Sequence, residues 1–245
     1  MNQIKILKTI WIISHIGTLL CVLFFPIDIL LIGILVGLTL HMLGQGISLH
    51  RYFSHRSFKT YRIVDIFLTF ITIPCSLGSP ISWAALHRYH HRVSDTKLDV
   101  QSPTHNAWHD IWFCNYLGTA AGLNLIKDLL RDRFQVWIHK NYTNLLICWI
   151  LFVSCFGFKL LSMLVFIPIV VTYTLTMLGS IVVHKWGYQN HETTDFSKNS
   201  LIISLFTFGD GWHNNHHAEP SKYQHGERWF EFDLLSYIIR LIKIN

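Results

Sequence analysis

Four long apolar stretches constrain this chain more than any other feature. They lie at residues 9–25, 27–48, 142–158 and 160–183. Each is close to the ~17–25 residues that a membrane-spanning helix needs. Charged residues make up only 14% of the chain, well below the ~25% that is typical of a soluble domain. We therefore expect an all-α integral membrane protein that forms one domain over residues 1–245.

The links within the two pairs of stretches are very short. Phe25-Pro26 joins the first two stretches, and Lys159 joins the last two. Each pair is expected to form a helical hairpin. Of the 20 Lys and Arg residues only Lys159 lies in a link, and the positive-inside rule places basic segments in the cytoplasm. The prediction is a multi-pass protein with both termini, and a helical cap between the hairpins, on the cytoplasmic side.

Histidine motifs lie in the segments that flank these stretches. Residues 87–91 and 213–217 share the pattern His-x-x-His-His, and His50 and His55 lie upstream. On a helix, positions i, i+3 and i+4 share one face, so each triplet can direct three imidazoles to one region. His50 and His55 would point about 140° apart on an ideal α-helix. Either the helix breaks there, or the two rings bind different metals.

The motifs supply eight imidazoles, too many for one ion and enough for two. Imidazole without thiolate suits zinc, copper, iron or nickel. A structural zinc site normally closes with four ligands and usually includes cysteine, so the pattern favours an oxygen-activating pair of iron ions. His184, at the end of the last apolar stretch, is a further candidate that spacing alone does not decide. The eight candidates are His50, His55, His87, His90, His91, His213, His216 and His217.

A fifth apolar stretch, residues 63–82, is also long enough to cross a bilayer. A single crossing there would put the first two histidine motifs on opposite faces of the membrane. Asp65 near one end and the breakers Pro74, Gly78 and Pro80 fit a helix in the interface or beneath the cap. We predict that this segment does not span the membrane.

Taken together, the motifs resemble those of the membrane fatty acid desaturases, specifically the short bacterial-type delta-9 (stearoyl-type) branch. The resemblance covers about residues 46–240, although over residues 125–175 only hydrophobicity agrees. Besides the three histidine boxes, the matching segments are 94–96 with Asp99, 209–212, 226–230 and Asp233.

The resemblance implies a fold, a cofactor and a reaction. It implies that the eight box histidines and His184 bind a non-haem di-iron centre that uses O2 to insert a cis double bond, at delta-9, into a saturated acyl chain. It also implies an acyl tunnel, a lipid-, CoA- or carrier-linked substrate, and a separate electron donor such as ferredoxin or cytochrome b5. Two departures stand out: Ser180 replaces a usual Asn, and Asp99-Val100-Gln101 replaces a frequent Asp-Pro-His. Separately, Ala85-Leu86 replaces charged residues of the animal acyl-CoA type.

Further residues are candidates for supporting roles. Trp83, Trp186 and Tyr188 are candidate tunnel residues, or else interfacial aromatic residues. Asp210 could instead cap the helix of the third box. His41 lies inside the second apolar stretch, where a histidine is functional by default, but we expect a packed, hydrogen-bonded residue. His225 is expected at the surface. The candidates for orienting the ligands are Ser180, Asp95, Asp99, His109, Asp210, Asn214 and Asn215.

Three other functions compete with desaturation. An acyl or lipid hydroxylase of the same di-iron superfamily would use the same metal site. A b-type haem electron-transfer protein would need single histidines facing each other in mid-membrane, unlike the adjacent pairs found here. A membrane zinc protein would not need nine imidazoles. The basic residues do not form runs, so membrane lipids and an acidic electron carrier are the expected partners, and nucleic acid is not.

Overall fold

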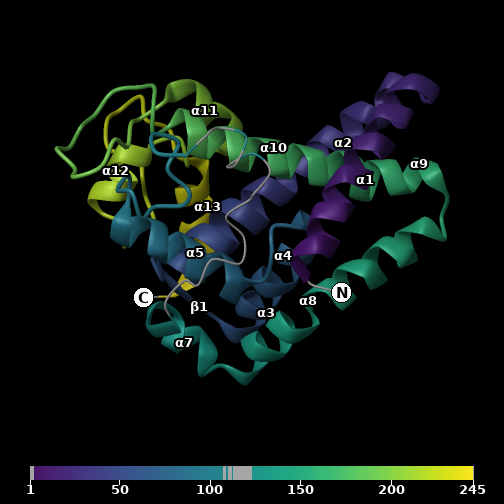
Figure 1. Cartoon of the computed structure of the whole chain (residues 1–245), viewed down its shortest axis with the longest axis horizontal. Coiled ribbons are helices and arrows are strands. Elements are labelled where there is room, and N and C mark those ends of the chain that lie inside the picture. Colours follow the sequence, from purple (N-terminus) through teal and green to yellow (C-terminus); the bar gives the residue numbers. More distant parts are fainter. Residues whose placement is uncertain (1–2, 107–108, 110–111, 113–122, 245) are drawn as a thin grey trace.

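Long helices dominate the computed structural model, which describes residues 3–106, 109, 112 and 123–244 (Figure 1). Three of them have the length and apolar composition of a membrane span: residues 3–24, 27–54 and 158–182. The first is α1 (Gln3–Phe24); the second joins α2 (Ile27–Leu40) to the π-helix η1 (His41–Ser54); the third joins α9 (Phe158–Leu161), η3 (Ser162–Phe166) and α10 (Ile167–Val182). The mostly helical prediction is confirmed.

Most of the predicted span 142–158 lies in the second half of a longer helix, α8 (Arg133–Ser154), which ends four residues before the predicted boundary. This helix is not among the three apolar helices. Its first turns carry Arg133 and Lys140, and the apolar part after Asn141 is only about 20 Å long at 1.5 Å per residue. One helix of the expected second hairpin is therefore more polar than predicted, and the hairpin arrangement stays a prediction.

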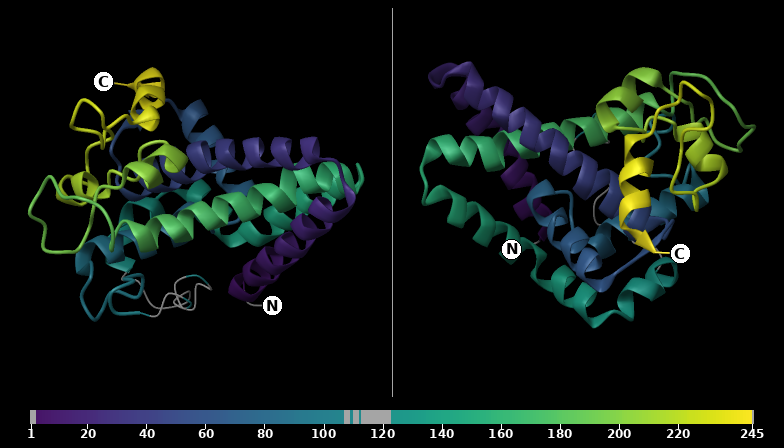
Figure 2. Two further views of the ribbon diagram at one scale, coloured as in Figure 1. Left: turned by 90° about the horizontal axis from the view of Figure 1, so that it is seen from above. Right: turned by 180° about the vertical axis from the view of Figure 1, so that it is seen from behind.

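Small residues let α2 and α10 lie side by side (Figures 1 and 2). A Cβ atom on Gly33 would come within 2.9 Å of Ile167, and one on Gly37 would lie 3.1 Å from the Cα of Pro168. Close approach at small residues is how helices pack where lipid removes the hydrophobic driving force. This contact places the ends of η1 and α10 next to each other.

The segment predicted not to span consists of α3 (Arg62–Phe70), α4 (Thr72–Cys75) and α5 (Pro80–Val93). The chain bends by 84° between α4 and α5. Gly78 has a positive φ of 100° and Pro80 begins α5, so both act at the bend, whereas Pro74 lies inside α4. The bent pair has the composition of a broken span or a re-entrant loop, and its non-spanning character stays a prediction.

Shorter elements gather at the end where η1 and α10 finish (Figure 2). A two-stranded antiparallel sheet, which the sequence did not predict, pairs Lys59 with Ile244 and Thr60 with Lys243. It ties the chain after the first histidine box to the C-terminal helix. These elements are η2 (Leu123–Ile126), α7 (Lys127–Leu130), α11 (Leu201–Thr207), α12 (His213–Ala218), α13 (Leu234–Ile242), β1 (Lys59–Thr60) and β2 (Lys243–Ile244).

A buried arginine joins the helix of the first box to the C-terminal segments. The Arg51 side chain is fully buried and donates to Asp210 at 2.9 Å, to Asp233 at 2.9 Å and to the Tyr223 carbonyl at 2.6 Å. A buried charge is tolerated only when it is paired and hydrogen-bonded. This network therefore fixes η1 against the segment that leads into α12.

We predict that Arg51→Met destabilises the folded protein by about 3–5 kcal/mol, because it leaves two buried carboxylates without their cation. The measurement is the thermal unfolding of purified protein in detergent.

The matched control is Arg56→Met. Arg56 pairs with Asp128, and both side chains are about 40% exposed, so the expected change is only about 0–1 kcal/mol. Equal effects of the two substitutions would contradict the role assigned to Arg51.

Candidate metal centre

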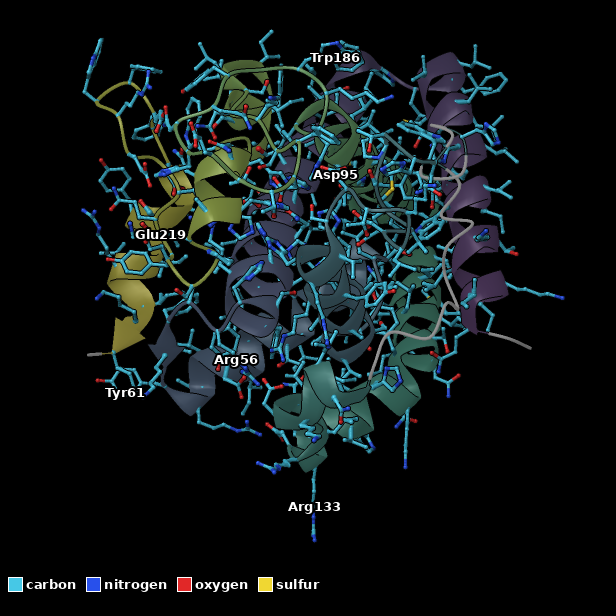
Figure 3. All side chains as sticks on the ribbon, turned by 60° about the vertical axis from the view of Figure 1, so that its left-hand side comes forward. Arg56, Tyr61, Asp95, Arg133, Trp186 and Glu219 are labelled. Carbon is cyan, nitrogen blue, oxygen red and sulfur yellow. The ribbon has the colours of Figure 1, made fainter. Side chains whose placement is uncertain are left out.

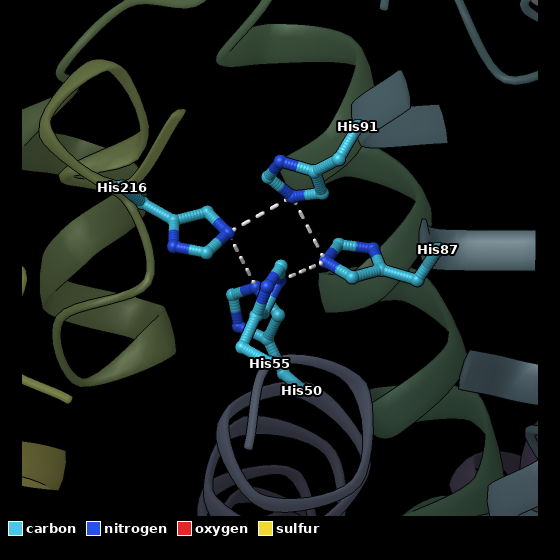
Figure 4. Close-up of side chains that lie close together, drawn as sticks. All are labelled: His50, His55, His87, His91 and His216. Carbon is cyan, nitrogen blue, oxygen red and sulfur yellow. Dashed lines mark hydrogen bonds between the residues drawn. The ribbon is translucent and has the colours of Figure 1, made fainter. Parts of the chain in front are cut away.

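Five histidines from three helices converge at the end of η1. The ligand atoms of His50, His55, His87, His91 and His216 all lie within 4.8 Å of one another. Figure 4 shows the Nε2 atoms of four neighbouring ring pairs facing each other. The pairs are His55–His87 at 2.8 Å, His50–His216 and His91–His216 at 3.0 Å, and His87–His91 at 3.1 Å.

The π-helix explains how the first box reaches one group. On an α-helix His50 and His55 would diverge, but η1 winds with i→i−5 hydrogen bonds, and the His55 amide donates to the His50 carbonyl at 3.1 Å. Their ring centroids are 5.1 Å apart. The helix thus winds differently instead of breaking between the two residues, and both rings lie in one group.

A second group lies beside the first. His90, His184, His213 and His217 also have ligand atoms within 4.8 Å of one another. His184, which spacing could not decide, comes from the end of α10 and lies with its Nε2 3.0 Å from that of His213. Each His-x-x-His-His motif thus divides between the groups instead of aiming at one ion. All nine predicted ligands are brought together, five in one group and four in the other.

Both groups are suited to metal ions because of which ring nitrogen carries the proton. In His184, Nδ1 donates to Asp95 at 2.7 Å, so the neutral ring presents an unprotonated Nε2 toward His213. Converging lone pairs repel each other unless a cation lies between them. Nine imidazoles without a thiolate suit zinc, copper, iron or nickel.

Burial favours the neutral form of the three rings of the third box, His213, His216 and His217. It lowers the pKa of His213 and of His216 well below the ordinary 6.5, and neighbouring rings lower the pKa further. Burial also lowers the pKa of His217 to about 4, although the hydrogen bond to Asp195 acts in the opposite direction. Metal ions compete poorly with protons for a histidine, so depressed pKa values favour metal binding near neutral pH.

Carboxylates orient three of the four rings in the second group. Such partners fix the tautomer and direction of a metal-binding histidine. Two of them, Asp95 and Asp99, were predicted; Asp195 was missed because it follows no histidine box in the sequence. The pairs, all from Nδ1 to Oδ2, are His90–Asp99 at 2.9 Å, His184–Asp95 at 2.7 Å and His217–Asp195 at 2.5 Å.

Asp210 contacts His50, a ring of the first group. Its Oδ2 lies 3.2 Å from Nδ1 of His50, and its Oδ1 accepts from Arg51. The alternative role as a helix cap is wrong, because α12 begins after Trp212 without a side-chain cap. His225, predicted at the surface, is only 2% exposed, and its ring centroid lies 4.4 Å from that of His216. The spacing of residues in the sequence did not indicate that His225 lies beside the rings.

The two asparagines of the third box form hydrogen bonds with loop residues and not with the histidine rings. The side-chain Oδ1 of Asn214 accepts from the backbone amides of Asn190 and His191, and the Asn215 side chain donates to the backbone carbonyl of His225 and to Glu231.

Of the two remaining candidates for orienting the ligands, one lies beside the rings and the other does not. Ser180 lines the cavity next to the rings and donates to the Thr176 carbonyl at 3.0 Å. His109 is exposed and belongs to neither group.

A cavity of about 80 Å³ lies against rings of both groups. Of the three candidate tunnel aromatics, Trp83 lines it. Trp186 lies at the outer rim of the molecule, 61% exposed (Figure 3), and the Tyr188 hydroxyl donates to Glu231 at 2.6 Å. The structure does not bring these two residues to the cavity. Their positions fit the alternative of interfacial aromatic residues.

The sequence model of the Fatty acid desaturase family matches residues 27–240, so the chain belongs to this family. It is 32% identical over 252 residues to an sn-1 stearoyl-lipid 9-desaturase of Anabaena variabilis, covering 99% of this chain and 92% of that protein. It is 34% identical over 223 residues to Delta-9 acyl-lipid desaturase 1 of Arabidopsis thaliana, covering 86% of this chain and 71% of that protein.

Other relatives differ in length and in their named substrates. The chain is 33% identical over 226 residues to an icosanoyl-CoA 5-desaturase of Limnanthes douglasii, covering 86% of this chain. It spans 61% of the length of that protein, and 56% of the length of a chloroplastic lipid desaturase of Arabidopsis thaliana.

We predict that the purified protein binds two metal ions per chain, one for each group. His216→Ala should lose at least one of the two ions, because it removes a ring that contacts two others of the five-histidine group. Elemental analysis of the purified protein measures this.

The control for metal content is His139→Ala, since His139 bonds Ser79 outside both groups. Unchanged metal content in His216→Ala would contradict the assignment.

Asp195→Asn should weaken metal binding about 10- to 100-fold, because it removes the anionic acceptor of the His217 ring. Competition against a chelator gives the affinity. Glu227→Gln is the matched control, since Glu227 pairs with the half-buried His191 away from both groups. If both variants released metal at the same chelator concentration, the orienting role of Asp195 would be wrong.

Proposed function

We propose that this protein catalyses the O2-dependent insertion of a cis double bond into a saturated fatty acyl chain at a non-haem di-iron centre. The observation that carries the proposal is the pair of adjacent histidine groups, five and four rings, in a chain of the fatty acid desaturase family. A cavity lies directly against rings of both groups.

The proposed ligands are the nine histidines of the two groups. An iron pair bound there would supply the activation of O2 that removes hydrogen from an unactivated methylene. Iron is preferred over zinc because a closed structural zinc site would use four ligands and usually cysteine. The described cysteines lie outside both groups.

The protein's own contribution is positioning and exclusion of water. An acyl chain has no polar handle along its length, so the shape of the cavity must decide which carbons face the rings. A misplacement of about 1 Å can reduce a rate about a hundredfold. The fixed directions of His90, His184 and His217, set by their carboxylate partners, meet this requirement on the protein side.

We propose delta-9 as the position of the new bond. The relative that this chain matches over nearly its full length is a stearoyl-lipid 9-desaturase, although another relative is named as an acyl-CoA 5-desaturase. The reducing electrons come from a separate donor protein. This donor would dock on the cytoplasmic face, which is also the face on which both chain termini are expected. Basic residues such as Lys127, Arg131 and Lys222 give that face a positive charge that attracts acidic proteins and anionic lipids.

The test is the fatty-acid profile of a host that expresses the wild type, compared with the His216→Ala variant. A new cis-monoene should appear with the wild type only, and mass spectrometry of a derivative should place the bond at carbon 9. A hydroxylated chain in its place would identify the protein as an acyl hydroxylase of the same superfamily and contradict the proposal.

A further inference from the structure

A group of unpaired polar atoms surrounds the cavity below the metal centre. The cavity lies between η1, α5 and α10, and its lining includes rings of both histidine groups. His41 and Gln45, on the same face of η1, lie nine and five residues before His50, which is about two turns and one turn of a helix with i→i−5 hydrogen bonds. Both side chains are more than nine-tenths buried, with exposures of 1% and 8%.

Besides His50 Nδ1 and Asp210 Oδ2, which lie 3.2 Å apart, four side chains of this lining carry buried polar atoms without a hydrogen-bond partner among the described residues. They are both ring nitrogens of His41, Oε1 of Gln45, Nε1 of Trp83 and Oε1 of Gln101. Among the described residues the backbone of Thr172 approaches the His41 ring, but neither ring nitrogen makes a hydrogen bond of normal geometry. The prediction of a packed His41 is confirmed, and its hydrogen bond stays a prediction. Since nearly all buried polar groups in proteins are paired, these atoms indicate a ligand.

The chemistry of the unpaired atoms restricts that ligand. A neutral imidazole offers one donor and one acceptor, an indole nitrogen only donates, and an amide oxygen only accepts. A simple anion would leave the two amide oxygens unpaired, and a cation would leave the indole donor unpaired. A small O–H group, which both donates and accepts, satisfies the whole set. The cavity of about 80 Å³ has room for more than one water molecule.

We propose that His41 and Gln45 bind a small cluster of water molecules in this cavity, and that the cluster limits the length of acyl chain that fits beside the metal centre. The second half rests on the proposed function. Methylene groups cannot satisfy these polar atoms, so an acyl chain that entered this space would displace the water at a free-energy cost. His41 is thus a specificity-determining residue.

Three variants of purified, metal-loaded protein test this. His41→Leu removes the polar ring and should allow longer chains. His41→Gln keeps one donor and one acceptor and should retain the wild-type preference. Thr39→Val is the matched control, because Thr39 lies two residues away on the exposed side of the same helix and bonds only the Leu35 carbonyl among described residues.

The first readout is the shift in melting temperature caused by saturated fatty acids of 14 to 20 carbons, about the length range of membrane acyl chains. The chain length that gives the largest shift should increase by about two carbons or more in His41→Leu only. An unchanged preference in folded, metal-loaded His41→Leu would overturn the specificity claim.

The second readout is a high-resolution experimental structure of the wild type. Water density within hydrogen-bond distance of the His41 ring supports the site, and a protein group or a dry cavity there overturns it. If water is present but no fatty acid stabilises the wild type, the water site stands and the acyl-chain function fails. The two failures are therefore distinguishable.

Discussion

The structure depends on bringing together nine imidazole rings, five of them buried and four half-buried, so that their ring nitrogens face each other. A cation between Nε2 atoms that lie 2.8–3.1 Å apart would be bound by their lone pairs together. Nearly every other feature of this end of the molecule holds the rings in that arrangement. The metal is thus expected to stabilise the fold as well as to support the chemistry, because metal binding in such sites is coupled to folding.

Three kinds of interaction bring the rings together from distant parts of the chain. Close packing of α2 on α10 at Gly33 and Gly37 aligns the helices that carry His50 and His184. The buried Arg51 then ties the first box to the segment before the third box. Aspartates at Nδ1 set the ring directions of the second group. Loss of any one of these leaves the ligands present but misdirected.

Much of this was predictable from the sequence, and the failures have physical causes. All nine rings of the two groups were among the predicted ligands, six of them in triplets at i, i+3 and i+4 and His184 through the family resemblance. Their division into two groups was not predicted, since face-sharing says nothing of which rings meet across helices. His50 and His55 lie in the same group because η1 is a π-helix, and no residue pattern in the sequence predicted this winding. Asp195 and His225 reach the site through loops, where sequence distance carries no spatial information.

The central claim is that each histidine group holds one iron ion. Anomalous X-ray scattering on either side of the iron absorption edge, from crystals of the purified protein, tests it most directly. The account predicts two iron peaks, one among His50, His55, His87, His91 and His216 and one among His90, His184, His213 and His217. A single peak, or two peaks with the absorption edge of zinc, would contradict it.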